Sequence, residues 1–94
     1  MGSSARRDCI VDESICNEAL DLLSVDRMLD YGHPSENLTR TAILWSVVLG
    51  VDVDASQVAT CMALMKISRQ CHTPLRDNTV DAIAYLLIAD SLMH

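Results

Sequence analysis

The chain has 94 residues, a length that suits one domain. Half of its residues are apolar but only 3% are aromatic, so its core must be built from aliphatic side chains, which favours helices over a β-sandwich. Thirteen acidic residues against seven Lys and Arg give a net charge of −6, which argues against direct binding to the phosphate backbone of nucleic acids.

The N-terminal segment, residues 1–11, is expected to be flexible, ahead of a single helical domain over residues 12–94. Met1–Ser4 are either native or a remnant of expression. No apolar run approaches the ~20 residues of a membrane-spanning helix, and no apolar stretch of a signal peptide follows the N-terminus, so we expect a cytoplasmic protein that does not enter membranes. The four cysteines lack zinc-ribbon spacing and are expected to be free thiols that mostly pack as small hydrophobes; they are Cys9, Cys16, Cys61 and Cys71.

Caps and apolar periodicity predict two helices in the first half of the chain. The first covers residues 14–25, with Asp12 or Ser14 as its N-cap. The second begins near Ser35, because Pro34 keeps the preceding residue out of the helical region, and it ends at Gly50. The apolar stripes of these helices are Ile15, Ala19, Leu22 and Leu23 in the first, and Leu38, Ala42, Trp45 and Leu49 in the second.

Two further helices are predicted in the second half. A capping box formed by Asp54 and Gln57 starts a helix that runs to about Cys71. After a polar turn, Asp77 or Asn78 is expected to cap the last helix. The inward-facing residues are Val58, Cys61, Met62, Met65 and Ile67 in the third helix, and Val80, Ile83, Ala84, Leu87, Ile88 and Leu92 in the fourth.

These elements predict an all-α fold, a compact bundle of about four short helices or a three-helix bundle with the first helix docked on it. Short connections favour antiparallel neighbours. The chain carries more apolar surface than one small core can cover, so we expect a symmetric homo-oligomer.

A first group of polar side chains surrounds the turn before the second helix. Helix N-termini favour anionic ligands, so this group is a candidate binding site. The alternative is a structural turn in which the tyrosine covers the end of the bundle. The candidate ligand-binding residues here are Arg27, Tyr31, His33, Glu36 and Asn37.

A second group spans the third and fourth helices. Two antiparallel helices bring Lys66 and Arg69 near Asp77 and Asp81, either as structural ion pairs or as a functional site. Asp77 and Asp81, four residues apart, form a candidate Mg²⁺ site, because Mg²⁺ accepts one or two carboxylates together with substrate phosphates. The candidate ligand-binding residues here are Lys66, Arg69, Asn78, Asp81 and Tyr85.

Three segments carry a family resemblance: Arg27-x3-Tyr31-Gly-His-Pro-x-Glu-Asn37, Val58-Ala-x2-Met-x-Leu-x-Lys66-Ile-x-Arg69 and Asp77-x3-Asp81-x3-Tyr85. Over about two thirds of its length the chain resembles a family of small proteins encoded by phages and prophages, known as a domain of unknown function. The resemblance implies a phage protein in the cytoplasm of a bacterial host.

A more remote likeness is to the all-α nucleotide pyrophosphatases of the MazG type, which are helical assemblies that bind Mg²⁺ through Glu-x-x-Glu and Glu-x-x-Asp motifs. Asn78-x-x-Asp81 stands where the second motif is expected, and no Glu-x-x-Glu precedes it. The likeness therefore implies nucleotide binding more than hydrolysis.

Two functions follow as hypotheses. In the first, the protein binds a nucleotide or related phosphorylated small molecule: Arg27, Lys66 and Arg69 hold the phosphates, Tyr31 stacks on the base, and Asn37 and Asp81 bind its polar edges, with Mg²⁺-dependent hydrolysis as a subsidiary activity. In the second, it is an acidic protein-interaction module that inhibits a host enzyme or defence system. Convergence of the site residues on one concave surface favours the first, and a continuous acidic face favours the second.

Overall fold

A computed structural model describes residues 11–24 and 32–94. Every regular element in these two ranges is an α-helix, which confirms the all-α fold. The helices are α1 (Ser14–Leu22), α3 (Pro34–Leu49), α4 (Ala55–His72) and α5 (Arg76–Leu92). None of them is both long enough and apolar enough to pass through a membrane. Residues 1–10 of the N-terminal segment, with Met1–Ser4 and Cys9, lie outside the described residues.

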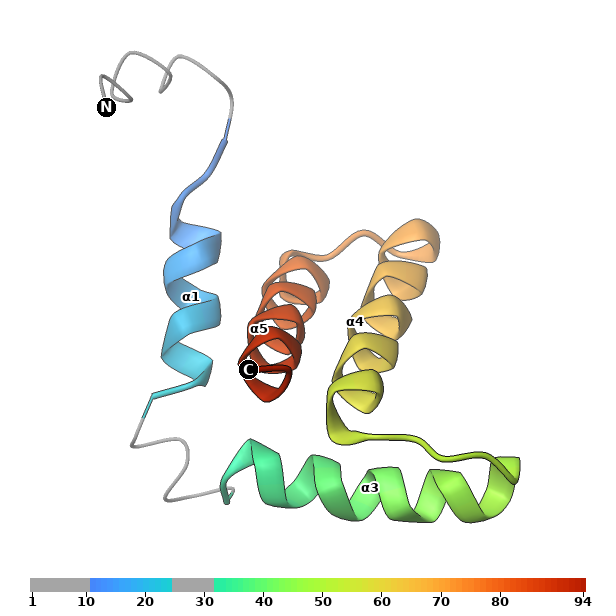
Figure 1. The fold of residues 1–94 in the computed structure, drawn as a ribbon. Helices are drawn as coiled ribbons and strands as arrows, with labels where there is room; N and C mark the ends of the chain where they lie inside the picture. Colours follow the sequence, from blue (N-terminus) through green and yellow to red (C-terminus); the bar gives the residue numbers. More distant parts are fainter. Residues whose placement is uncertain (1–10, 25–31) are drawn as a thin grey trace.

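Helices α1, α5 and α4 form one layer, and α3 lies at a steep angle to it (Figure 1). α4 and α5 are antiparallel neighbours joined by residues 73–75, and α1 lies on the other side of α5. α3 runs across one end of this layer and packs against α4. The predicted all-α bundle is thus confirmed, and α3 crosses its end because the connection after α3 turns the chain through an angle instead of reversing it.

That connection is built by local polar contacts. Gly50 ends α3 in the left-handed region with φ of 71°, as predicted, and its N–H donates to the carbonyl of Ser46. The Ser46 hydroxyl then accepts from the backbone N–H of Val53 at 2.9 Å. Asp54 and Gln57 form the predicted capping box at the start of α4, with both hydrogen bonds at 2.9 Å.

Two predicted helix ends are wrong. α1 ends at Leu22 instead of Val25, and Glu13 stands at its N-cap position without a capping side chain, although the Asp12 carboxylate accepts from the N–H of Ser14 at 3.0 Å. α5 begins at Arg76, so neither Asp77 nor Asn78 caps it. The reason at α5 is that Asn78 points inward and bonds to the preceding turn instead of to its own helix start.

The core consists of two small groups of buried residues. The larger contains Leu38, Ala42, Val58, Ala59 and Ala89, and Trp45 and Met62 pack against it. The smaller contains Ala19, Val80 and Ala84, with Ile15, Leu22 and Leu23 packed around it as the sequence predicted. Most of the fully buried side chains are alanines, so the helices are held by close approach more than by large interlocking residues.

Several residues predicted to face inward are exposed: Leu49, Cys61, Met65, Ile67 and Leu87. α4 faces α5 with the stripe that includes Ala59 and Ala63, so Cys61 and Met65 lie off this stripe, whereas the half-exposed Ile67 borders a hollow between α4 and α5. Leu49 is the last residue of α3 and remains 61% exposed. Cys16, Cys61 and Cys71 are free thiols, and all three are exposed instead of packed in the core.

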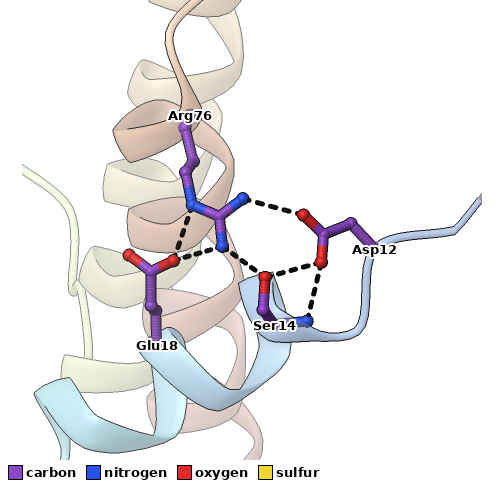
Figure 2. Close-up of polar contacts among 4 residues, drawn as sticks. All are labelled: Asp12, Ser14, Glu18 and Arg76. Carbon is purple, nitrogen blue, oxygen red and sulfur yellow. Dashed lines mark hydrogen bonds and ion pairs between the residues drawn. The ribbon is translucent and has the colours of Figure 1, made fainter.

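Arg76 ties the start of α5 to the start of α1 (Figure 2). Its guanidinium donates to Glu18 Oε2 at 2.6 Å from Nε, to Asp12 Oδ2 at 3.0 Å and to the Ser14 hydroxyl at 2.7 Å. The Ser14 hydroxyl in turn donates to the other Asp12 oxygen. Ser14 and Glu18 of α1, Arg76 of α5 and Asp12, which precedes α1, therefore form one exposed network.

This network predicts an acid-dependent loss of stability. Hydrogen bonds from Ser14, and then from Arg76, lower the pKa of Asp12 from 3.8 to about 2. A lowered pKa in the folded protein means that the carboxylate stabilises the fold above about pH 4, and that this contribution disappears as the pH falls from about 4 to about 2. We expect the melting temperature of the wild type to fall more steeply over this interval than that of Asp12→Asn. Asp21→Asn, a change at an exposed position of α1, is the control, and equal slopes for all three proteins would contradict the assignment.

Candidate functional site

The candidate site is a pocket of about 330 Å³ between the end of α1, the start of α3 and the middle of α5. Its size is at the lower end of the range for small-molecule sites. Three polar side chains line it: Asn37 from α3, and Asp81 and Tyr85 from α5. The apolar wall is formed by Leu22, Leu23, Pro34, Leu38, Ala84 and Ile88.

Asp81 is held by an ion pair with Lys66 of α4. Lys66 Nζ lies 3.1 Å from Asp81 Oδ2, and the side chains are 18% and 33% exposed, respectively. The pairing follows from the antiparallel α4–α5 contact, which places Lys66 beside Asp81 just as it places Gln70 beside Asn78. Of the predicted contacts between basic residues of α4 and aspartates of α5, the one between Lys66 and Asp81 is thus present. An ammonium has three donors, so Lys66 retains donors beyond the one aimed at Asp81.

Asn37 is placed by the turn that begins α3. Gly32 has φ of 84°, a conformation that glycine adopts without strain, and a β-carbon there would stand 3.6 Å from Asn37 Nδ2. His33 is the N-cap of α3, and its Nδ1 accepts from the N–H of Ser35 at 3.1 Å. The Gly-His-Pro sequence therefore has a structural role: it sets the turn and brings the chain against Asn37.

Glu36 and Arg69, which the sequence also singled out, do not line the pocket. Glu36 is exposed and borders a shallow surface hollow with Arg40 and Ile43 instead. Arg69 is exposed on α4 and, within residues 11–24 and 32–94, takes part in no ion pair. Arg27 and Tyr31 lie outside the described residues.

Asn78 has a structural position. It is 7% exposed, and its Nδ2 donates to Gln70 Oε1 at 3.1 Å and to the Thr73 carbonyl at 3.2 Å. Gln70 Oε1 also accepts from the N–H of Leu75 at 2.9 Å. The Asn78 amide therefore closes the α4–α5 turn.

The two aspartates of the proposed Mg²⁺ site have different surroundings. Asp77 is exposed in the first turn of α5, whereas Asp81 is engaged by Lys66. Among the described residues, no group of three or more His, Cys, Asp or Glu side chains is placed to hold a metal ion. The donor set offers Mg²⁺ at most the two carboxylates and leaves the rest of its coordination to water and substrate.

The pocket's apolar wall was not predicted as part of a site. Its leucines and Ile88 had been placed in the core by periodicity, and the packing leaves them at its edge. Leu22 and Leu23 both pack against the smaller core group and both line the pocket, so periodicity alone could not separate the wall of the pocket from the core.

Comparison with known proteins gives the family. The sequence profile of the family described as "Domain of unknown function (DUF6378)" matches residues 14–93. The chain belongs to the DUF6378 family. Two relatives of this DUF6378 chain are phage proteins, each named "Gene 55 protein", which confirms the resemblance to a phage-encoded family.

The relative in Mycobacterium phage D29 is 40% identical over 76 residues, which cover 80% of this chain and 50% of the relative. The one in Mycobacterium phage L5 is 36% identical over 72 residues, covering 76% of this chain and 46% of the relative. The DUF6378 chain thus spans about half the length of these curated relatives. No solved structure matches it. The likeness to MazG-type pyrophosphatases stays a prediction.

Proposed function

We propose that the pocket binds a nucleotide or a related phosphorylated small molecule in the cytoplasm of the phage's host. The observation that carries this proposal is the meeting of Asn37, Asp81 and Tyr85 at one pocket. The sequence placed these residues in two separate groups on different helices. Side chains with complementary hydrogen-bonding capacity that converge on an apolar cavity are typical of small-molecule sites.

The chemistry of the lining suits the base and sugar of one nucleotide. The apolar wall and the Tyr85 ring favour a flat, weakly polar group. The Asn37 amide both donates and accepts hydrogen bonds, and the Asp81 carboxylate accepts them from an amino or hydroxyl group. A cavity of about 330 Å³ leaves the phosphates at its mouth, near solvent.

We assign the phosphates to basic residues outside the described lining of the pocket. Lys66 approaches through its contact with Asp81, and Arg69 follows it by one turn on α4. Arg27 is included on the basis of sequence alone. Because only two carboxylates are offered for Mg²⁺, we propose binding without hydrolysis as the main activity.

The proposal is tested by calorimetry and thermal shift with a panel of mononucleotides, with and without Mg²⁺. A ligand present at 100 times its Kd is expected to stabilise the fold by about 2.7 kcal/mol. Asn37→Ala is expected to weaken binding at least about tenfold, which corresponds to the loss of one good hydrogen-bonding group. Arg69→Ala is expected to weaken binding with little change in melting temperature, because that side chain is exposed.

Thr39→Ala is the matched control, since Thr39 is exposed on the same helix and borders the hollow beside Arg40 instead of the pocket. No stabilisation by any nucleotide of the panel would refute the proposed ligand class. Unchanged binding by Asn37→Ala would place the ligand elsewhere on the protein.

The acidic inhibitor is the weaker alternative. Several carboxylates already have partners within the chain: Asp12 and Glu18 bind Arg76, and Asp81 binds Lys66. Asp54 caps α4. Carboxylates used in this way contribute less to an acidic face that would imitate nucleic acid.

A further inference from the structure

α3 carries a large apolar surface that faces away from its contact with α4. It consists of Ile43, Leu44, Val47, Val48 and Val51, which we call the α3 patch. Each of these side chains is between 60% and 83% exposed. The opposite face of α3 holds Leu38 and Ala42 in the core, so the patch is a second apolar face on the same helix.

The patch is as large as the largest apolar patches found on monomeric proteins, which are often binding surfaces. The exposures correspond to roughly 500–600 Å², which is at the top of the range for the largest apolar patch on a monomeric protein. A stable interface buries about 800 Å² on each partner. The patch together with a rim of neighbouring polar residues would supply that area.

The charged residues at the two ends of the α3 patch indicate which kind of partner fits it. No charged residue occurs between Arg40 and Asp52. Arg40 precedes the patch on the same helical face, and the exposed Asp52 follows it just beyond the end of α3. One end of the surface is therefore basic, the other is acidic, and the centre is neutral.

We propose that a second copy of this chain covers the α3 patch, with the two α3 helices antiparallel about a two-fold axis between Leu44 and Val47. Only the antiparallel arrangement sets Arg40 of each copy beside Asp52 of the other. A parallel pair would place like charges together. A two-fold interface requires a self-complementary surface, and this one is neutral at its centre in a chain whose net charge is −6.

This dimer leaves the candidate site accessible. The pocket uses Pro34, Asn37 and Leu38 from the first turns of α3, whereas the patch occupies its last turns and the residue after Gly50. The proposal is therefore independent of the proposed function, and either can fail alone.

The first test is the mass of the 94-residue chain in solution, measured by light scattering and sedimentation over a range of concentrations. We expect twice the chain mass of 10.3 kDa at tens of micromolar. Val47→Glu is expected to return the mass of a single chain, because it places a pair of carboxylates near the two-fold axis. Leu64→Glu, a change at an exposed leucine of α4, is the matched control and is expected to remain dimeric.

The second test distinguishes the orientation of the helices. Arg40→Asp alone and Asp52→Arg alone each place like charges at both ends of the interface, and each is expected to raise the dimer Kd about tenfold or more. The double variant, Arg40→Asp with Asp52→Arg, restores opposite charges and is expected to return the Kd to within a few-fold of the wild type. Circular dichroism confirms that each variant remains helical.

A single-chain mass for the wild type at 100 μM would overturn the proposal. It would be the expected result if a segment of the longer relatives, absent from this chain, covered the patch. Dimers that survive Val47→Glu would place the interface on another face. Equal Kd values for the single and double charge variants would refute the antiparallel arrangement.

Discussion

Replacing Trp45 by alanine is expected to lower the free energy of unfolding by about 3 kcal/mol, the lower end of the range for truncating a large aromatic side chain, because Trp45 is only partly buried. Its ring packs against the larger core group, which otherwise consists of Leu38, Val58 and three alanines. In a domain of this size that loss lowers the melting temperature by more than 10 °C.

Trp45 is the only tryptophan, so unfolding of the variant is followed by circular dichroism instead of intrinsic fluorescence. Trp45→Phe, which keeps an aromatic ring at the core, is expected to recover most of the stability. Thr39→Ala on the exposed side of α3 provides the baseline for a truncation without packing loss. A change below 1 kcal/mol in Trp45→Ala would show that the contact between α3 and the core contributes little.

Ala59→Leu is expected to destabilise the protein by about 2 kcal/mol through overpacking. Ala59 is fully buried on α4 and shares the larger core group with Ala89 of α5. Leucine adds three heavy atoms to alanine, and because Ala59 is fully buried in a closely packed core, even the first added carbon meets its neighbours. The helices must then separate or the new side chain must adopt a strained rotamer.

Thr60→Leu is the matched control for this substitution, because it introduces the same side chain at the next, exposed position of α4. Urea denaturation should show a lower midpoint for Ala59→Leu and a midpoint near the wild-type value for Thr60→Leu. Equal midpoints would mean that the α4–α5 contact has room for a larger residue, and that its alanines do not set the distance between the helices.

The helix boundaries that the sequence predicted correctly are those specified locally. Gly50 and the Asp54–Gln57 capping box act on residues within one turn, so their effect is visible in a short stretch of sequence. The start of α5 was mispredicted because Asn78 bonds to Gln70, eight residues earlier, and that contact exists only once the turn has formed. Periodicity likewise identified the apolar faces of the helices. Where a helix has two such faces, periodicity does not show which one a neighbouring helix covers.

The same distinction applies to the candidate site. Asp81 and Tyr85 were singled out because polar side chains at helical spacing stand out beside an apolar stripe, and Asn37 because it belongs to the polar group around the turn before α3. Arg76 was not singled out, since its partners Asp12 and Glu18 are about sixty residues away in the chain and nothing near it in sequence indicates them.

The network around Arg76 has a consequence for the pocket. α1 contributes Leu22 and Leu23 to the pocket wall, while the other end of the helix is tied to α5 by exposed charges. The buried contribution of α1 to the core is a single alanine. Exposed ion pairs weaken as dissolved salt shortens the Debye length to about 8 Å at physiological ionic strength and less above it. A higher ionic strength therefore weakens the contacts that hold the start of α1 to α5. Because the other end of α1 forms part of the pocket wall, we expect the shape of this mostly apolar pocket to depend on the salt concentration.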